Sequence, residues 1–196
     1  MKGLKITALI LTAAIGATAL TACKNEKKPV SSGINIISSQ KQGGAGVDGE
    51  NIAIIDPEAE KNNFIFKYNG VNVVINTPMS KVLKSLPENY DYNEAPSCAG
   101  QGIAKTYTYN NGSFSIQTNP VEKEDSISMI LLSDDTVSTA EGIFIGNTAE
   151  QVKAAYGEPD KDASTDNAFV YYKGTSVLTF TIMDGKVTSI AYQAKV

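Results

Sequence analysis

The chain has 196 residues, 17 basic and 21 acidic side chains, a formal net charge of −4 at pH 7, and no histidine or tryptophan. Every basic residue is a lysine, which argues against nucleic-acid binding, where arginine usually leads. Without histidine the chain can form neither a Ser-His-Asp triad nor an imidazole zinc site. We therefore predict no catalytic residues of these kinds, no metal, no cofactor and no nucleic-acid partner.

Residues 1–22 have the pattern of a signal peptide. Lys2 and Lys5 precede an uncharged apolar run over residues 6–20, which is shorter than a membrane span. The following Leu-Thr-Ala-Cys ends at Cys23 and resembles the lipobox of bacterial lipoproteins. That resemblance implies a diacylglycerol on the Cys23 thiol and a protein anchored at the extracytoplasmic face of the cell membrane. The alternative is ordinary secretory cleavage, which would leave Cys23 as a free thiol.

Residues 23–62 read as a flexible polar tether that starts at the lipidated cysteine. They are rich in Gly, Ser, Gln and Lys and have few aromatic side chains. Once Cys23 is lipidated, Cys98 is the only other cysteine, so no intrachain disulfide is expected. The folded domain, residues 63–196, must then be stabilised by its core.

A first structural pattern occupies residues 63–136. Residues 64–68 and 71–75 flank an Asn-Gly pair, which is a strong hairpin signal. Thr77 and Pro78 then predict a helix start, and apolar residues follow at helical spacing. After a predicted polar loop over residues 88–102, three strands are expected. They are residues 105–109, 114–118 and 127–132.

A similar pattern occupies residues 137–196. A short strand is predicted near residues 142–145, and Thr148 and Gln151 then fit a capping box at the start of a helix. Gly157 and the proline two residues later predict the end of that helix. Three further strands are expected. They are residues 168–172, 177–183 and 187–192.

The two patterns together predict an α+β fold built from tandem strand-helix-three-strand repeats. Apolar and polar residues alternate along the strands, which is typical of an antiparallel sheet with one solvated face. We expect one antiparallel sheet of eight or nine strands with two helices on one face.

The repeated strand-to-helix segment also resembles a known family. Gly-Ile-x-Ile-Gly-x-Thr leads into the helix at residue 142, and Tyr-Gly-x-Pro ends it at residue 159. This pattern resembles the β-lactamase-inhibitor-protein-like fold, and in particular uncharacterised small Gram-positive lipoproteins with a tandem repeat of it. The resemblance implies a binding fold rather than a reaction. The chain departs from true β-lactamase inhibitors, which are secreted, larger and disulfide-bonded.

Candidate binding residues are tyrosines and one cysteine, because tyrosine combines a large apolar ring with a polar tip. They are Tyr90, Tyr92, Cys98, Tyr107, Tyr109 and Tyr171. The alternative for the tyrosines is core or strand packing, and for Cys98 it is a small buried apolar residue.

The functional prediction is a membrane-anchored extracytoplasmic binding or scaffold module for a protein or cell-wall partner. It would use the helix-free sheet face and the loop over residues 88–102. The alternative is an inhibitor or modulator of an envelope enzyme. An exposed apolar patch would favour binding, whereas a deep pocket with two carboxylates would favour catalysis.

Overall fold

The computed structural model describes residues 56–97 and 102–195. The predicted signal peptide, most of the predicted tether, Cys23 and Cys98 lie outside these ranges. The elements in chain order are α1 (Pro57–Asn62), β1 (Ile65–Tyr68), β2 (Val71–Val74), α2 (Met79–Val82), β3 (Tyr90–Pro96), β4 (Ile103–Tyr109), the 3-10 turn η1 (Asn110–Gly112), β5 (Phe114–Val121), β6 (Glu124–Leu132), α3 (Ala149–Tyr156), β7 (Ala168–Lys173), β8 (Ser176–Met183) and β9 (Lys186–Ala194).

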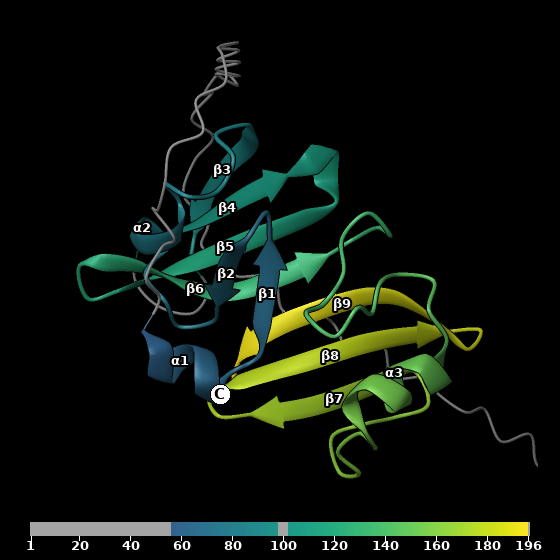
Figure 1. The fold of residues 1–196 in the computed structure, drawn as a ribbon. Coiled ribbons are helices and arrows are strands. Elements are labelled where there is room, and N and C mark those ends of the chain that lie inside the picture. The colour runs from purple at the N-terminus through teal and green to yellow at the C-terminus, as the bar shows by residue number, and fades with distance from the viewer. Residues whose placement is uncertain (1–55, 98–101, 196) are drawn as a thin grey trace, which may run out of the picture. The chain divides into compact units, whose positions relative to one another are not determined.

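Seven of the described strands form one antiparallel sheet in the order β3-β4-β5-β6-β9-β8-β7 (Figure 1). The predicted single sheet of eight or nine strands is wrong in one respect, because β1 and β2 form a separate two-stranded hairpin. Phe66 of this hairpin packs on Phe114 of β5 and Tyr192 of β9, at ring-centroid distances of 4.9 and 6.1 Å. The hairpin therefore covers the sheet rather than extending it.

One face of the sheet carries the core, as the alternation predicts. Ile116 of β5 and Phe180 of β8 are fully buried on that face, while the residues directly before and after each of them in its strand face the other way. Val82 of α2 and Val152 of α3 belong to the same buried cluster. Both predicted helices thus pack on one face, and the other face is lined by partly exposed residues such as Gln117.

Helix α3 begins and ends where its sequence signals predict. The Thr148 side chain accepts a hydrogen bond from the Gln151 backbone, and the Gln151 side chain accepts one from the Thr148 backbone, which completes a capping box. The helix stops at Gly157, whose φ of 82° is readily adopted by glycine.

Helix α2 begins later than predicted, because the chain stays extended through Pro78 and the helix begins at Met79. Thr77 does not cap it. Instead the Thr77 carbonyl accepts a hydrogen bond from the Ile127 backbone at 2.9 Å.

Two predicted segments have a different structure. Residues 142–145 form no strand; the backbone there is held by the Asn147 side chain, which accepts a hydrogen bond from the Phe144 backbone at 2.8 Å. The segment over residues 88–102, predicted to be a loop, contains β3, which pairs with β4 over seven residue pairs. Asp, Asn, Glu and Pro in β3 disfavour strands by propensity, and pairing with a long neighbouring strand overrides this.

Helix α1 lies within residues 23–62, the segment predicted to be a flexible tether. Asp56 caps α1 by accepting a hydrogen bond from the Glu58 backbone at 3.0 Å. The helix docks on the β7–β8 turn through Asn63, whose side-chain oxygen accepts hydrogen bonds from the Thr175 backbone and hydroxyl, both at 3.0 Å.

The two halves of the sheet have matching backbone contacts before each helix. Asn76 and Thr77 exchange hydrogen bonds with Ile127 at 2.8 and 2.9 Å, and Gly146 and Asn147 exchange them with Val187 at 2.8 Å each. Both halves also have a register shift, in the β5–β6 ladder after Gln117 and in the β8–β9 ladder after Thr181.

Candidate binding site

Four of the predicted tyrosines lie together on two neighbouring strands. Tyr90 pairs with Tyr109, and Tyr92 with Tyr107, so their side chains lie on the same face of β3 and β4. Ring centroids within this group, which we call the β3–β4 tyrosine cluster, are 5.2 to 5.4 Å apart. The structure therefore brings together residues that lie 15 to 19 positions apart in the sequence.

The β3–β4 tyrosine cluster continues the core toward the sheet edge. Tyr109 is 1% exposed and Tyr107 is 6% exposed, whereas Tyr92 is 48% exposed and its hydroxyl donates to Glu94. Burial raises the pKa of Tyr109 above its ordinary value. These rings lie on the core side of the sheet, and not on the helix-free face that the functional prediction names as a binding surface.

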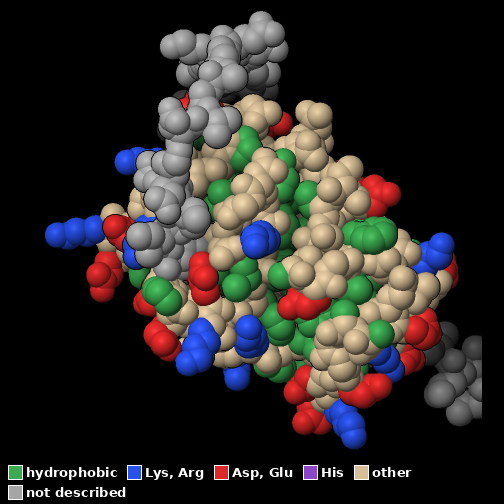
Figure 2. Space-filling model, viewed as in Figure 1, with side chains coloured by type: hydrophobic (Ala, Val, Ile, Leu, Met, Phe, Trp, Pro, Cys, Tyr) green, Lys and Arg blue, Asp and Glu red, His purple; other side chains and the backbone are tan. Residues whose placement is uncertain are grey.

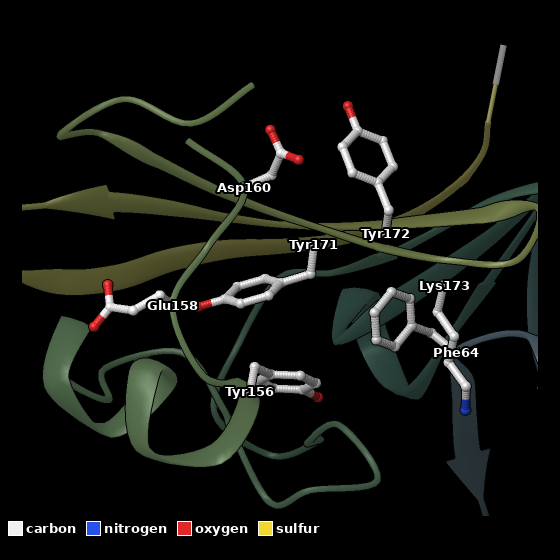
Figure 3. Close-up of a pocket in the computed structure, with 7 residues that line it drawn as sticks. All are labelled: Phe64, Tyr156, Glu158, Asp160, Tyr171, Tyr172 and Lys173. Atoms are coloured by element: carbon white, nitrogen blue, oxygen red, sulfur yellow. The ribbon is translucent and has the colours of Figure 1, made fainter. Parts of the chain in front are cut away.

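Tyr171 lies elsewhere, in a pocket beside α3 that we call the α3 pocket (Figure 3). Its volume is about 430 Å³. The residues that line it are Phe64, Tyr156, Glu158, Asp160, Tyr171, Tyr172 and Lys173. Three elements contribute aromatic rings: the segment before β1, the end of α3, and β7.

The rings of the α3 pocket are held in place by contacts on both sides. The Tyr156 ring lies 6.1 Å from Phe64 and 5.4 Å from Tyr171, between centroids. The Tyr171 hydroxyl donates to the Gly157 carbonyl at 3.0 Å, and the Tyr156 hydroxyl donates to the Glu141 carboxylate. Burial, with a smaller contribution from the charge of Glu158, raises the pKa of Tyr171 to about 12. Its hydroxyl is therefore protonated, and a donor, at neutral pH.

The two carboxylates of the α3 pocket are engaged with other groups. Glu158 is paired with Lys153 at 3.2 Å, and its side chain is 76% exposed. Asp160 accepts hydrogen bonds from the backbones of Asp162 and Ala163 at 3.0 and 2.9 Å. In Figure 3 the Glu158 and Asp160 carboxylates point in different directions, away from the rings of Tyr156 and Tyr171. They form no converging pair of the kind that acid–base catalysis needs.

One face of the molecule is of mixed charge. In Figure 2 both acidic and basic side chains are visible, mostly around the rim of the face that is shown, with hydrophobic side chains between them. Among residues 56–97 and 102–195, no three His, Cys, Asp or Glu side chains are placed to hold a metal ion together. Within those same ranges no helix has the length and apolar character to cross a membrane.

Sequence reasoning found Tyr171 but missed Phe64 and Tyr156 as site residues. The sequence predicts that Phe64 lies in the first strand of a hairpin. Phe64 lies 92 residues before Tyr156, and no local signal relates the two positions. Cys98 lies outside the described residues.

No family model and no curated protein matches the chain. Among solved structures, it is similar to the uncharacterized protein yfeY from Escherichia coli, with 15% identity and a TM-score of 0.41, over 67% of this chain and 97% of that one. It is also similar to an extracellular protein containing a SCP domain from Bacillus anthracis, with 11% identity and a TM-score of 0.35, over 80% of this chain and 50% of that one. Similarity at this level establishes neither a family nor a function. The resemblance to Gram-positive lipoproteins stays a prediction.

Proposed function

We propose that this chain is a membrane-anchored extracytoplasmic lipoprotein whose folded domain binds a protein or cell-wall ligand in the α3 pocket. The observation that carries the proposal is the arrangement of Phe64, Tyr156 and Tyr171, which bring three aromatic rings from separate elements to one open pocket. Pockets of a few hundred Å³ that combine apolar walls with a few polar groups are typical ligand sites.

The lining suggests the chemistry of the ligand. Aromatic rings provide a flat apolar surface, and Asp160, Tyr172 and Lys173 surround it with acceptors and donors. A ligand with an apolar face and a hydrogen-bonding edge, such as a sugar ring or a short peptide, matches this combination. Both occur in bacterial cell walls, which an anchored extracytoplasmic protein could reach.

Binding is favoured over catalysis by the state of the carboxylates. Glu158 is exposed and paired with Lys153, and Asp160 holds a backbone turn. A general acid or base must instead be within hydrogen-bond reach of a reacting proton, with its partner groups oriented toward the same site.

We also propose that residues 63–136 and 137–196 are tandem copies of one unit. The matched hydrogen bonds before α2 and α3 and the matched register shifts in the two halves support this. The sheet order supports it too, because β6-β5-β4 and β9-β8-β7 run outward in the same way from the central β6–β9 pair.

The anchor is tested by replacing Cys23. We expect Cys23→Ala to prevent lipid attachment and to move the protein from the membrane fraction to the soluble fraction, as measured by fractionation and by mass spectrometry of the mature N-terminus. A Cys23→Ala protein that stayed in the membrane fraction and was still processed before residue 23 would contradict the lipobox interpretation.

The α3 pocket is tested by sedimentation of the detergent-solubilised full-length protein with purified peptidoglycan. We expect Phe64→Leu, which removes a ring of the aromatic surface, and Tyr172→Ala, which removes a side chain at its edge, each to weaken retention at least about fivefold. Met183→Ala is the matched control, because Met183 is an exposed apolar residue of the neighbouring strand outside the pocket.

Two results would argue against this proposal. Equal retention of all three variants would place binding outside the α3 pocket. If peptidoglycan retained no protein, and crosslinking on intact cells captured an envelope enzyme whose activity this protein lowers, the inhibitor alternative would replace a cell-wall ligand.

A further inference from the structure

A second pocket lies between α2 and the β5–β6 hairpin, on the opposite half of the sheet from the α3 pocket. We call it the α2 pocket, and its volume is about 310 Å³. It is lined by Met79, Ser80, Leu83, Tyr107, Lys123, Glu124 and Asp125. Tyr107 connects this pocket to the β3–β4 tyrosine cluster, since its ring is 5.2 Å from that of the exposed Tyr92.

The corresponding place in the other half is occupied by a lysine of the chain itself. The Lys153 ammonium lies 5.4 Å from the centroid of the Phe169 ring, within the range of a cation–π contact. The same ammonium is paired with Glu158 at 3.2 Å. An aromatic face and a carboxylate thus hold one primary ammonium group beside α3.

The matched contacts relate the two places residue by residue. Asn76 and Gly146 hold equivalent positions before the helices, so Leu83 of the first half corresponds to Lys153 of the second. Ile116 and Phe180 hold equivalent positions, because each directly precedes the residue after which the ladder of its half shifts register. Tyr107 pairs with Ile116, and Phe169 pairs with Phe180, so Tyr107 is the counterpart of Phe169. The first half therefore keeps the aromatic ring but has leucine where the second half has the ammonium group.

We propose that the α2 pocket binds a primary alkylammonium group carried on a peptide ligand, with the cation placed against Tyr107. The inference goes beyond ligand binding in the α3 pocket and rests on the proposed equivalence of the two halves. The shorter Leu83 side chain leaves open the space that Lys153 fills in the other half.

The charges around the α2 pocket are consistent with a cationic group. Asp125 and Glu124 lie on its wall, and Lys105 bonds one oxygen of Asp125 at 2.7 Å. The ammonium of a ligand could share the second oxygen of Asp125 and bond the exposed Glu124 carboxylate. Lys123 and Lys105 oppose a cation, so a carboxylate or carbonyl elsewhere on the peptide would complement them.

The test is a titration of the ¹⁵N-labelled full-length protein in detergent with Nα-acetyl-L-lysine amide. We expect saturable shifts of the backbone amide signals of residues 79–83 and 123–125, with a dissociation constant of roughly millimolar order, as suits one cation–π contact and one charged hydrogen bond. Nα-acetyl-L-norleucine amide, which lacks the ammonium, should produce no saturable shift. Signals of Tyr156 and Tyr171 report the α3 pocket in the same spectrum and should stay unchanged, since that pocket is tested separately with peptidoglycan.

Two pairs of variants test separately the aromatic ring of Tyr107 and the open space beside Leu83. Tyr107→Phe should keep the shifts, since phenylalanine serves in the other half, whereas Tyr107→Leu should weaken binding about fivefold or more. Leu83→Lys should abolish the shifts by supplying an internal ammonium, while Leu83→Met, similar in size but uncharged, should retain them. The inference is overturned if acetyl-lysine amide shifts none of these signals, if the norleucine amide shifts them equally, or if Leu83→Lys and Leu83→Met bind alike.

Discussion

The contact between α1 and the β7–β8 turn can be tested by adding one methyl group to the turn. Gly174 lies in this turn with a φ of 56°, and a Cβ there would be 2.0 Å from the Asn62 carbonyl oxygen. That atom belongs to the backbone, so it cannot move aside as a flexible side chain could. Gly112 lies in the equivalent β4–β5 turn with a φ of 100°, and a Cβ there would meet nothing within 4 Å. Gly174→Ala and Gly112→Ala therefore differ mainly in the clash with α1.

The expected costs follow from two contributions. Alanine at a positive φ is strained by about 1–2 kcal/mol, and both variants carry this cost. In Gly174→Ala the end of α1 must also move, which disturbs three hydrogen bonds: the two that Asn63 accepts from Thr175, and one from the Phe64 backbone to the Ser176 hydroxyl at 2.9 Å. At about 1 kcal/mol net for each bond lost, and with some of them retained, the additional loss is about 2 kcal/mol.

The assay is urea unfolding of both purified variants and the parent, followed by far-UV circular dichroism and by tyrosine fluorescence, since the chain has no tryptophan. We expect Gly174→Ala to lower the free energy of unfolding by about 3–4 kcal/mol and Gly112→Ala by about 1–2 kcal/mol. If the two variants lost the same free energy within about 0.5 kcal/mol, the docking of α1 on this turn would be refuted.

Two further predictions concern the core. Val82→Ala and Val152→Ala, both at fully buried positions of one cluster, should each lower the free energy of unfolding by about 1–2.5 kcal/mol, and each variant should unfold in a single transition. Exposed Lys81→Ala is the control and should stay within about 0.5 kcal/mol of the parent. Two separate steps in a denaturant melt would contradict a continuous sheet. Tyr109→Phe should leave the free energy of unfolding unchanged or raise it by about 1 kcal/mol, because the buried Tyr109 hydroxyl has no hydrogen-bond partner among the described residues. A loss above about 1 kcal/mol would show that this hydroxyl does have a hydrogen-bond partner.

The elements that the sequence predicts well are those specified by neighbouring residues. The capping box of α3 needs only Thr148 and Gln151, and the β1–β2 turn needs only Asn69 and Gly70, both of which have positive φ. The alternation along β5 likewise fixes which face is buried, because side chains alternate strictly in a strand.

The errors come from contacts between distant segments. The sequence of β3 is polar, and its strand structure depends on pairing with β4. The separation of the β1–β2 hairpin from the sheet depends on where Phe66 finds aromatic partners, 48 and 126 residues later in the chain. The α3 pocket was missed for the same reason, since its rings come from three segments that only the completed fold brings together. Tyr92 and Tyr107 were recognised by residue type, but their common orientation needed the β3–β4 register.

The place of β9 in the sheet has a consequence for how an exported chain would fold. β9 follows every other described strand in the chain, yet it lies between β6 and β8 and pairs with both. A chain that crosses a membrane N-terminus first would therefore hold two unjoined sheets, β3 to β6 and β7 to β8, each with an open edge. Such edges readily pair with other chains. Only the arrival of residues 186–194 would close the gap, so the interval just before their release is when this protein would most need protection from aggregation.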